Sequence, residues 1–182
     1  MVAEKTYSTQ RDRLCVFFSG MGMGFNKYDW EKYHLKLGYN CLLLTDENKR
    51  YYTDGVPQWT TSEQDTADKI KGLGYKEVCL VGSSMGGYGA IVAFQKLQLL
   101  GQKARILVFN PKTTFSGRDI GGVYSGGKRM AVFGSGDRDI YNTTRLSGFE
   151  RSQIRESVHS YLLSSLKKSG LLDSILAEWL RG

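Results

Sequence analysis

A glycine-rich turn between an apolar run and a helix of small residues constrains this chain more than any other feature. It lies within the stretch Lys76–Phe94, KEVCLVGSSMGGYGAIVAF, where residues 82–86 match the pattern G-x-S-x-G with Ser84 as the central serine. The apolar run before the turn predicts a buried strand, and residues 90–94 predict a helix after it. Because glycines allow a tight turn to pass close to its neighbours, the stretch predicts a strand, a sharp turn and a helix.

The chemistry that this turn favours begins with a hydroxyl group. A serine is a poor nucleophile unless a base removes its proton. A strained turn between a strand and a helix lifts the serine clear of the sheet, and the first N–H groups of the helix favour negative charge that develops nearby. Strand and helix both flank Ser84 as required, so the pattern favours a catalytic serine over a turn that only packs a helix on a strand.

Apolar runs and helical spacing predict the remaining elements in chain order. Strands are expected at 14–18, 40–44, 104–109 and 129–133, and helices at 26–37, from a cap at Thr60 or Thr61 to Gly74, and over 153–180 with a break at Gly170. Residues 1–12 are expected to be a flexible arm, and residues 112–127 an irregular connection. The alternation predicts one α/β domain over 1–182, a three-layer α/β/α sandwich with a mainly parallel sheet.

Composition narrows the classes of partner and cofactor. The net charge is +7, but Lys and Arg are scattered without long runs, so no specific nucleic-acid binding is expected. Three cysteines without a C-x-x-C pair predict buried thiols, with no metal site and no cofactor. The polar N-terminal residues and the lack of a long apolar stretch predict a cytoplasmic protein without a membrane span. The sequence does not indicate the oligomeric state.

The catalytic base can be chosen because the chain has only 2 histidines. His34 precedes Ser84 and His159 follows it, and in one known order of such triads the acid and then the histidine follow the serine. His159 is therefore the expected base. Two local structures are open for it: a surface position on a helix, or a turn after a short strand over residues 154–158.

The expected acid lies just after the strand at 129–133, where functional groups gather at the end of a parallel sheet. Asp137 and Asp139 both lie there, in the sequence GSGDRD. Asp137 is preferred because it is nearer to the strand end, and Asp139 is the alternative. The carboxylate would hold the histidine tautomer and stabilise the imidazolium that forms.

An oxyanion hole requires two N–H donors near the serine. The backbone N–H of Met85, the residue after the nucleophile, is one candidate. The other is Met21, in the loop SGMGMG after the first buried strand, with Gly20 and Gly22 as neighbours. The glycines let this backbone approach a substrate closely.

These motifs together resemble the α/β-hydrolase superfamily along nearly the whole chain. The segments SSMGGYGAI, VFNPKT and HSYLLSSLKKSGLLDSIL are similar to small, lid-poor hydrolase-like proteins associated with capsular or surface polysaccharide loci. The resemblance implies a minimal α/β-hydrolase fold and a Ser84–Asp137–His159 triad.

The resulting hypothesis is a serine hydrolase that cleaves an ester or thioester through an acyl-enzyme. The expected substrate is a small-molecule, glycan or lipid acyl ester. Two alternatives are an acyltransferase with a sugar or lipid acceptor, and a non-catalytic scaffold or binding protein with the same fold.

Overall fold

A computed structural model describes residues 2–5, 12–21, 30, 39–154, 159 and 161–181 of the 182-residue chain. The helix expected over residues 26–37 lies outside these ranges apart from Trp30, and so does His34. No helix in the described ranges is long and apolar enough to cross a membrane.

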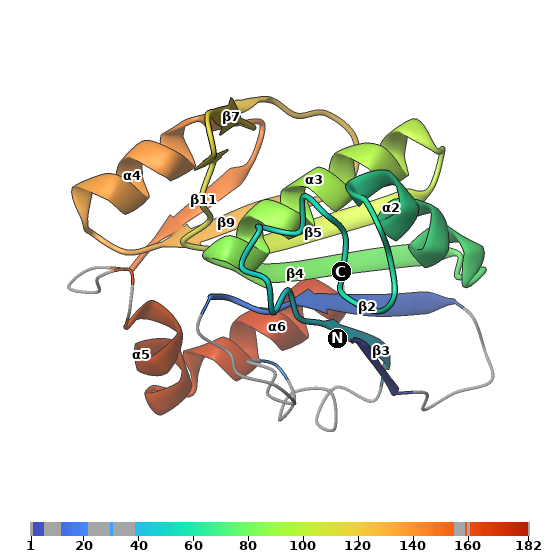
Figure 1. The fold of residues 1–182 in the computed structure, drawn as a ribbon. Helices are drawn as coiled ribbons and strands as arrows, with labels where there is room; N and C mark the ends of the chain where they lie inside the picture. The colour runs from blue at the N-terminus through green and yellow to red at the C-terminus, as the bar shows by residue number, and fades with distance from the viewer. Residues whose placement is uncertain are drawn as a thin grey trace.

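A seven-stranded sheet forms the centre of the molecule (Figure 1). Its strand order is β1-β3-β2-β4-β5-β9-β11, and each neighbouring pair is parallel except β1 with β3. The bounds in this order are Val2–Lys5, Asn40–Leu44, Arg13–Phe18, Glu77–Ser83, Lys103–Phe109, Arg129–Phe133 and Glu150–Gln153. Because the parallel strands all run in one direction, their carboxyl ends meet along one edge of the sheet, and loops from several strands can build one site there.

Helices cover both faces of this sheet, which confirms the predicted α/β sandwich (Figure 1). Helices α2 (Glu63–Gly72) and α3 (Met85–Leu99) pack on one face, while α5 (Leu162–Lys168) and α6 (Leu171–Arg181) pack on the other. Alternate residues of a strand point to opposite faces. In β2, accordingly, Leu14 and Val16 join the core beneath α3, and Cys15 joins the core beneath α6.

The three cysteines lie in register across neighbouring strands. Cys15 pairs with Cys41 on one side and with Cys79 on the other. All three are free thiols and fully buried, as the sequence predicted.

The chain starts differently from the flexible arm expected over residues 1–12. Val2–Lys5 form β1, which pairs antiparallel with β3. The four residues VAEK carry no strong strand pattern of their own. An edge strand gains its stability from backbone pairing with its neighbour, and a single sequence does not show that pairing.

The second half of the chain contains more regular structure than the sequence indicated. Residues 137–144 form a helix, α4, where a loop was expected, and β11 forms over Glu150–Gln153, just before the tail that was expected to be helical. The irregular connection over 112–127 contains three two-residue strands, and a fourth follows it: β6 (Thr114–Phe115), β7 (Arg118–Asp119), β8 (Gly122–Val123) and β10 (Leu146–Ser147). These segments are polar or very short, so hydrophobic periodicity does not identify them.

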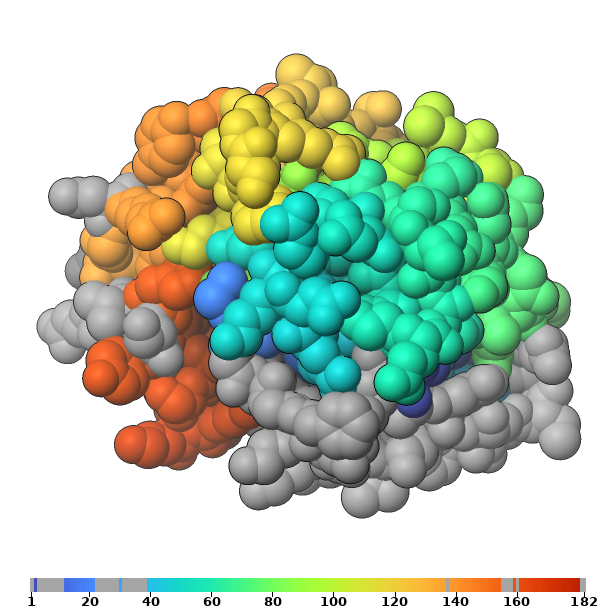
Figure 2. All heavy atoms as spheres, viewed as in Figure 1, coloured from blue at the N-terminus to red at the C-terminus, as the bar shows by residue number. Residues whose placement is uncertain are grey.

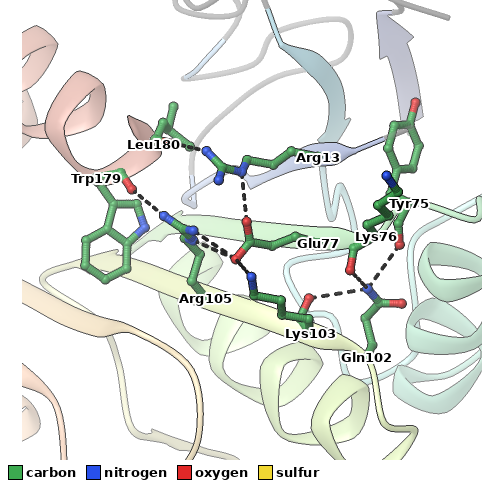
Figure 3. A network of polar contacts seen from close by, with 9 residues as sticks. All are labelled: Arg13, Tyr75, Lys76, Glu77, Gln102, Lys103, Arg105, Trp179 and Leu180. Atoms are coloured by element: carbon green, nitrogen blue, oxygen red, sulfur yellow. Dashed lines mark hydrogen bonds and ion pairs between the residues drawn. The ribbon is translucent and has the colours of Figure 1, made fainter. Parts of the chain in front are cut away.

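Charged side chains fasten the C-terminal helix to the amino ends of the central strands (Figure 3). The carboxylate of Glu77 lies 2.9 Å from Arg13 Nε and 2.9 Å from Arg105 Nη2. Arg105 also donates to the carbonyl oxygen of Trp179 at 3.1 Å, and Arg13 donates to that of Leu180. Cations at the last carbonyls of a helix are favourable, so this network holds α6 against the sheet.

Candidate active site

The turn at Ser84 joins β4 to α3, as the sequence pattern predicted. Ser84 has a φ of 51° and a ψ of −116°, a conformation that residues other than glycine seldom adopt. A Cβ at Gly82 would lie 2.3 Å from the carbonyl oxygen of Gly86, and one at Gly86 would lie 2.1 Å from that of Phe18. The two motif glycines are therefore required by close backbone contacts.

Backbone hydrogen bonds from the neighbouring strand hold this strained turn. The N–H of Ser84 donates to the carbonyl oxygen of Phe109 at 3.0 Å, and the carbonyl oxygen of Ser84 accepts from the N–H of Lys112 at 3.2 Å. Strained conformations persist when the surrounding structure determines them. The end of β5 supplies that support here.

The imidazole of His159 bridges the serine to a carboxylate. Its Nε2 lies 2.8 Å from Ser84 Oγ, and its Nδ1 lies 2.6 Å from Asp139 Oδ1. A neutral imidazole with its proton on Nδ1 donates to the carboxylate and leaves Nε2 to accept from the serine hydroxyl. The three side chains come from separate elements and form one continuous hydrogen-bonded path.

The segment that delivers His159 matches neither expected local structure in full. β11 ends at Gln153, before the strand that was considered over residues 154–158, and residues 155–158 lie outside the described ranges. His159 itself lies in a turn ahead of α5, and its side chain is 27% exposed. The ring is therefore mostly buried, and the part that remains exposed lines a cavity.

The carboxylate in contact with His159 belongs to Asp139 and not to Asp137, which the sequence analysis preferred. Asp137 is the first residue of α4, and Asp139 lies within its first turn. Positions two residues apart lie on different sides of a helix, so distance from the strand end does not decide which carboxylate meets the imidazole. Asp139 is only 2% exposed, which removes water from its bond to the imidazole.

Asn110 is a residue of the site that the sequence did not reveal. It is 2% exposed, and its Nδ2 donates to the carbonyl oxygen of His159 at 3.2 Å. Its Oδ1 accepts from the N–H of Gly134, just after β9, at 2.8 Å. Asn110 thus ties the histidine turn to the ends of two strands. The only signal in the sequence is the Asn-Pro pair at residues 110–111, which marks the end of a strand and does not by itself indicate a role in the site.

The two expected oxyanion donors lie on the serine side of the site. Met85 begins α3, where the first N–H groups have no partner within the helix. Met21 lies in the turn after β2, and it lines the same cavity as Ser84. The rest of the loop from Gly22 lies outside the described residues. The oxyanion role of Met85 and Met21 stays a prediction.

The start of the Met21 loop is held by a tyrosine from the long loop after β3. The hydroxyl of Tyr52 lies 2.8 Å from the carbonyl oxygen of Ser19 and 3.1 Å from that of Leu44, and its one proton is shared between these two acceptors. In Figure 2 part of the blue segment, residues 12–21, reaches the surface beside the cyan loop that follows β3. Tyr52 therefore fixes where the first strand ends and the candidate oxyanion loop begins.

An open cavity of about 400 Å³ lies at the carboxyl edge of the sheet, in front of Ser84 and His159. Phe109, Leu162 and Leu163 form its apolar wall. A volume of this size is within the range of small-molecule sites, which bury most of a bound ligand. Ser84 and His159 therefore share a space that a small substrate can occupy.

Positive charge lies close to the acid of the site. Burial lowers the pKa of the Lys112 ammonium, and the nearby Arg138 lowers it further, while Asp139 acts in the opposite direction. The Lys112 ammonium is thus close enough to interact with the Asp139 carboxylate. Within the described ranges, no three His, Cys, Asp or Glu side chains cluster as a metal site would require.

No protein-family model matches this chain, and no curated protein matches it. Solved structures do match it over nearly its whole length. A carboxylesterase structure from the thaumarchaeon Nitrososphaera gargenis has 14% identity and a TM-score of 0.62, covering 99% of this chain and 95% of that chain. The α/β hydrolase MGS-MChE2, from a sediment metagenome of the Mar Chica lagoon, has 14% identity and a TM-score of 0.60, with 99% and 94% covered.

A third match is a hormone-sensitive lipase from a metagenome library, with 11% identity and a TM-score of 0.65, covering 94% of this chain and 78% of that chain. At such low identity these matches establish the fold and not the activity. The chain therefore has the α/β-hydrolase fold that its motifs resembled.

Proposed function

We propose that this protein is a serine hydrolase that cleaves an ester or thioester with Ser84 as nucleophile, His159 as base and Asp139 as the orienting acid. The observation that supports the proposal is the hydrogen-bonded path of 2.8 Å from Ser84 Oγ to His159 Nε2 and 2.6 Å from His159 Nδ1 to Asp139 Oδ1. A nucleophile and base at this distance, with the base oriented by a third group, are arranged for covalent catalysis.

In the first half of the reaction, His159 Nε2 accepts the hydroxyl proton as Ser84 Oγ forms a bond to the acyl carbonyl carbon. The carbonyl oxygen becomes an oxyanion, for which the N–H groups of Met85 and Met21 are the proposed donors. The imidazolium then gives its proton to the leaving oxygen or sulfur, the bond to the leaving group breaks, and an acyl-serine remains.

In the second half, water takes the place of the departed alcohol or thiol. His159 accepts a proton from that water while its oxygen attacks the acyl-serine carbonyl. Collapse of the second tetrahedral intermediate returns the proton to Ser84 and releases the carboxylic acid. The carboxylate of Asp139 orients the ring and stabilises each imidazolium.

A fluorophosphonate probe tests the nucleophile directly, because it reacts with an activated serine. We expect one adduct, at Ser84, together with hydrolysis of 4-nitrophenyl acetate, and loss of both in Ser84→Ala. Ser83→Ala is the matched control, since Ser83 adjoins the nucleophile and lines the same cavity. Equal labelling of the wild type and Ser84→Ala, or no labelling at all, would support a non-catalytic scaffold.

The alcohol part of the proposed substrate is a sugar or lipid hydroxyl. The resemblance to proteins of polysaccharide loci supports a glycan ester, and the net charge of +7 is suited to an acidic one. Release of acetate from acetylated acidic saccharides tests this point. Transfer of the acyl group to an added sugar, in preference to water, would identify an acyltransferase instead.

A further inference from the structure

We propose that the hydroxyl of Thr143 binds a buried water molecule that also binds Oδ2 of Asp139, and that Thr143 thereby positions this carboxylate against the ring of His159. The inference rests on the proposed function, because it adds a positioning residue to the proposed triad. Thr143 is not among the described residues that line the cavity, so its role is exerted through Asp139.

The buried face of α4 is polar, which is unusual for a helix of a globular protein. Among its side chains that the structure describes, the buried ones are those of Asp139, Asn142 and Thr143, which are 2%, 3% and 0% exposed. Their spacing of three and four residues places them on one face of the helix. A surface helix ordinarily turns apolar residues toward the core at this spacing. Each of these buried polar groups therefore requires a hydrogen-bond partner.

Asn142 has such partners, and they fix the rotation of α4. Its Oδ1 lies 2.8 Å from Thr113 Oγ1 and 3.2 Å from the backbone nitrogen of Thr113. Its Nδ2 donates to the carbonyl oxygen of Arg138 at 2.8 Å. Thr113 is fully buried and follows the residue whose N–H supports the turn at Ser84. The helix that carries the acid is thus tied to the segment that supports the nucleophile.

Two oxygens on the same face have no hydrogen-bond partner among the described residues. Oδ1 of Asp139 is bonded to the ring of His159, but Oδ2 is buried without a partner, and so is Oγ1 of Thr143. A carboxylate oxygen requires a donor, and a threonine hydroxyl has one proton to donate. The two groups are therefore complementary, although they are not bonded to each other.

A single water molecule satisfies both oxygens. Residues four apart on a helix have their Cβ atoms about 5–6 Å apart. A water with hydrogen bonds of about 2.8 Å to each of two oxygens spans a gap of this size. It accepts the proton of the Thr143 hydroxyl and donates one of its own to Asp139 Oδ2. Buried waters in proteins typically bind polar groups that are otherwise unsatisfied.

The second contact determines how the carboxylate meets the imidazole. With Oδ1 on the ring and Oδ2 on the water, Asp139 is held at both oxygens and keeps its alignment with Nδ1 of His159. Without the water, Oδ2 is a buried acceptor that lacks a donor, which is unfavourable in the folded state. Thr143 therefore acts on catalysis through the orientation and charge of Asp139.

Two pairs of proteins test this role, because the members of each pair differ in the hydroxyl. The wild type is compared with Thr143→Val, in which a methyl group replaces the hydroxyl, and Thr143→Ser is compared with Thr143→Ala. The control is Thr144→Val, at the exposed neighbouring position, where the hydroxyl donates to the carbonyl oxygen of Tyr141 at 2.9 Å. Hydrolysis of 4-nitrophenyl acetate is measured across pH to obtain kcat and KM.

We expect loss of the hydroxyl to lower kcat about three- to tenfold in both pairs, with KM within about twofold. The acid limb of kcat/KM should move to higher pH, because a carboxylate with one donor fewer holds the imidazolium more tightly. Lys112 and Arg138, the charged groups near Asp139, are the same in every variant. Thr144→Val should keep the wild-type kcat and acid limb.

A hydroxyl without this role would give a different result. Replacing an unsatisfied buried hydroxyl by a methyl group is neutral or stabilising, so Thr143→Val would unfold at the same or a higher urea concentration. Its kcat and pH profile would equal those of the wild type. That outcome would overturn the positioning role and leave the hydrolase proposal unaffected. If Thr143→Val does not fold, the pair of Thr143→Ser and Thr143→Ala decides in the same way.

Two further measurements do not depend on activity. The proton resonance of the His159 Nδ1–H group, which reports the hydrogen bond to Asp139, should shift in Thr143→Val and not in Thr144→Val. A crystal structure of the wild type should show a water within hydrogen-bond distance of Asp139 Oδ2 and Thr143 Oγ1. Both results in a protein that hydrolyses no ester would support the positioning role while the proposed hydrolase fails. An unshifted resonance, or the lack of a bridging water, would overturn the positioning role at any level of activity.

Discussion

The amino ends and the carboxyl ends of strands β4 and β5 carry very different polar groups. At the amino ends, Glu77 and Arg105 form a buried ion-pair network that holds the last turn of α6 (Figure 3). At the carboxyl ends, Ser84 and Asn110 border an open cavity together with His159. Ion pairs occupy the amino ends and an open cavity lies at the carboxyl ends, although the same two strands support both.

The difference lies in whether the polar groups are satisfied without a ligand. Burial acts to raise the pKa of Glu77, but Arg105, Arg13 and Lys103 outweigh it and lower the pKa. The buried carboxylate is thus satisfied by protein cations, without a ligand, which suits a structural role. Ser84 instead stays in a strained turn beside the imidazole of His159, and backbone strain of this kind is found at functional sites. We therefore expect substitutions at the two ends to change different observables.

The largest expected effect is at the carboxyl end. His159→Gln removes the proposed base, and kcat/KM for 4-nitrophenyl acetate should fall about 10⁴-fold or more, as in serine enzymes that lose a triad member. The free energy of unfolding should change by less than about 1 kcal/mol, because the side chain is partly exposed. A large loss of stability with activity retained would show that His159 has a structural role and would contradict the expected difference between the two ends.

Glu77→Gln should produce the opposite pattern. It leaves Arg105 and Arg13 without their carboxylate, and removing one partner of a buried pair costs about 3 kcal/mol. Urea unfolding should show this loss, while kcat per folded molecule stays within about twofold of wild type. A fall in kcat with unchanged stability would show that the two ends are coupled.

Asn110→Ala sharpens the comparison within the carboxyl end. The variant loses the hydrogen bond that holds the carbonyl of His159, so the ring samples unproductive positions. We expect kcat to fall about tenfold, equivalent to about 1.4 kcal/mol, with KM within about twofold. Steady-state kinetics gives both values. A change in KM alone would assign Asn110 to substrate contact and not to positioning.

The smallest effect concerns the pH dependence of stability. The pKa of Glu77 is lowered from its ordinary value of 4.5, so its ionised form stabilises the fold above that pH. This contribution is lost as the pH falls below about 4.5 and through the lowered pKa. Unfolding curves for the wild type and Glu77→Gln should therefore converge in acid. A constant gap between them down to pH 2 would exclude this linkage.

The sequence predicted the helices and strands whose own residues show a clear hydrophobic pattern. The strands over residues 40–44 and 129–133 match their predicted bounds, because apolar runs mark strands buried on both faces. β1, β11 and α4 were not predicted, since polar edge strands and a polar helix depend on neighbours that are distant in the chain.

The candidate site divides in the same way. Counting histidines led to His159, which the structure brings to Ser84. The choice between Asp137 and Asp139 depended on α4, and the role of Asn110 depended on where the histidine turn folds back. Neither relation is local in sequence, so periodicity and spacing could not resolve them.

The most direct test of the proposed Ser84–His159–Asp139 relay compares two aspartates that are two residues apart. Asparagine at the orienting position favours the wrong imidazole tautomer, which costs about 10⁴-fold in kcat in the serine protease that defines the effect. The account predicts a loss of about 10³- to 10⁴-fold in kcat for Asp139→Asn and a change within about threefold for Asp137→Asn. A large loss in Asp137→Asn with Asp139→Asn near wild type would contradict it.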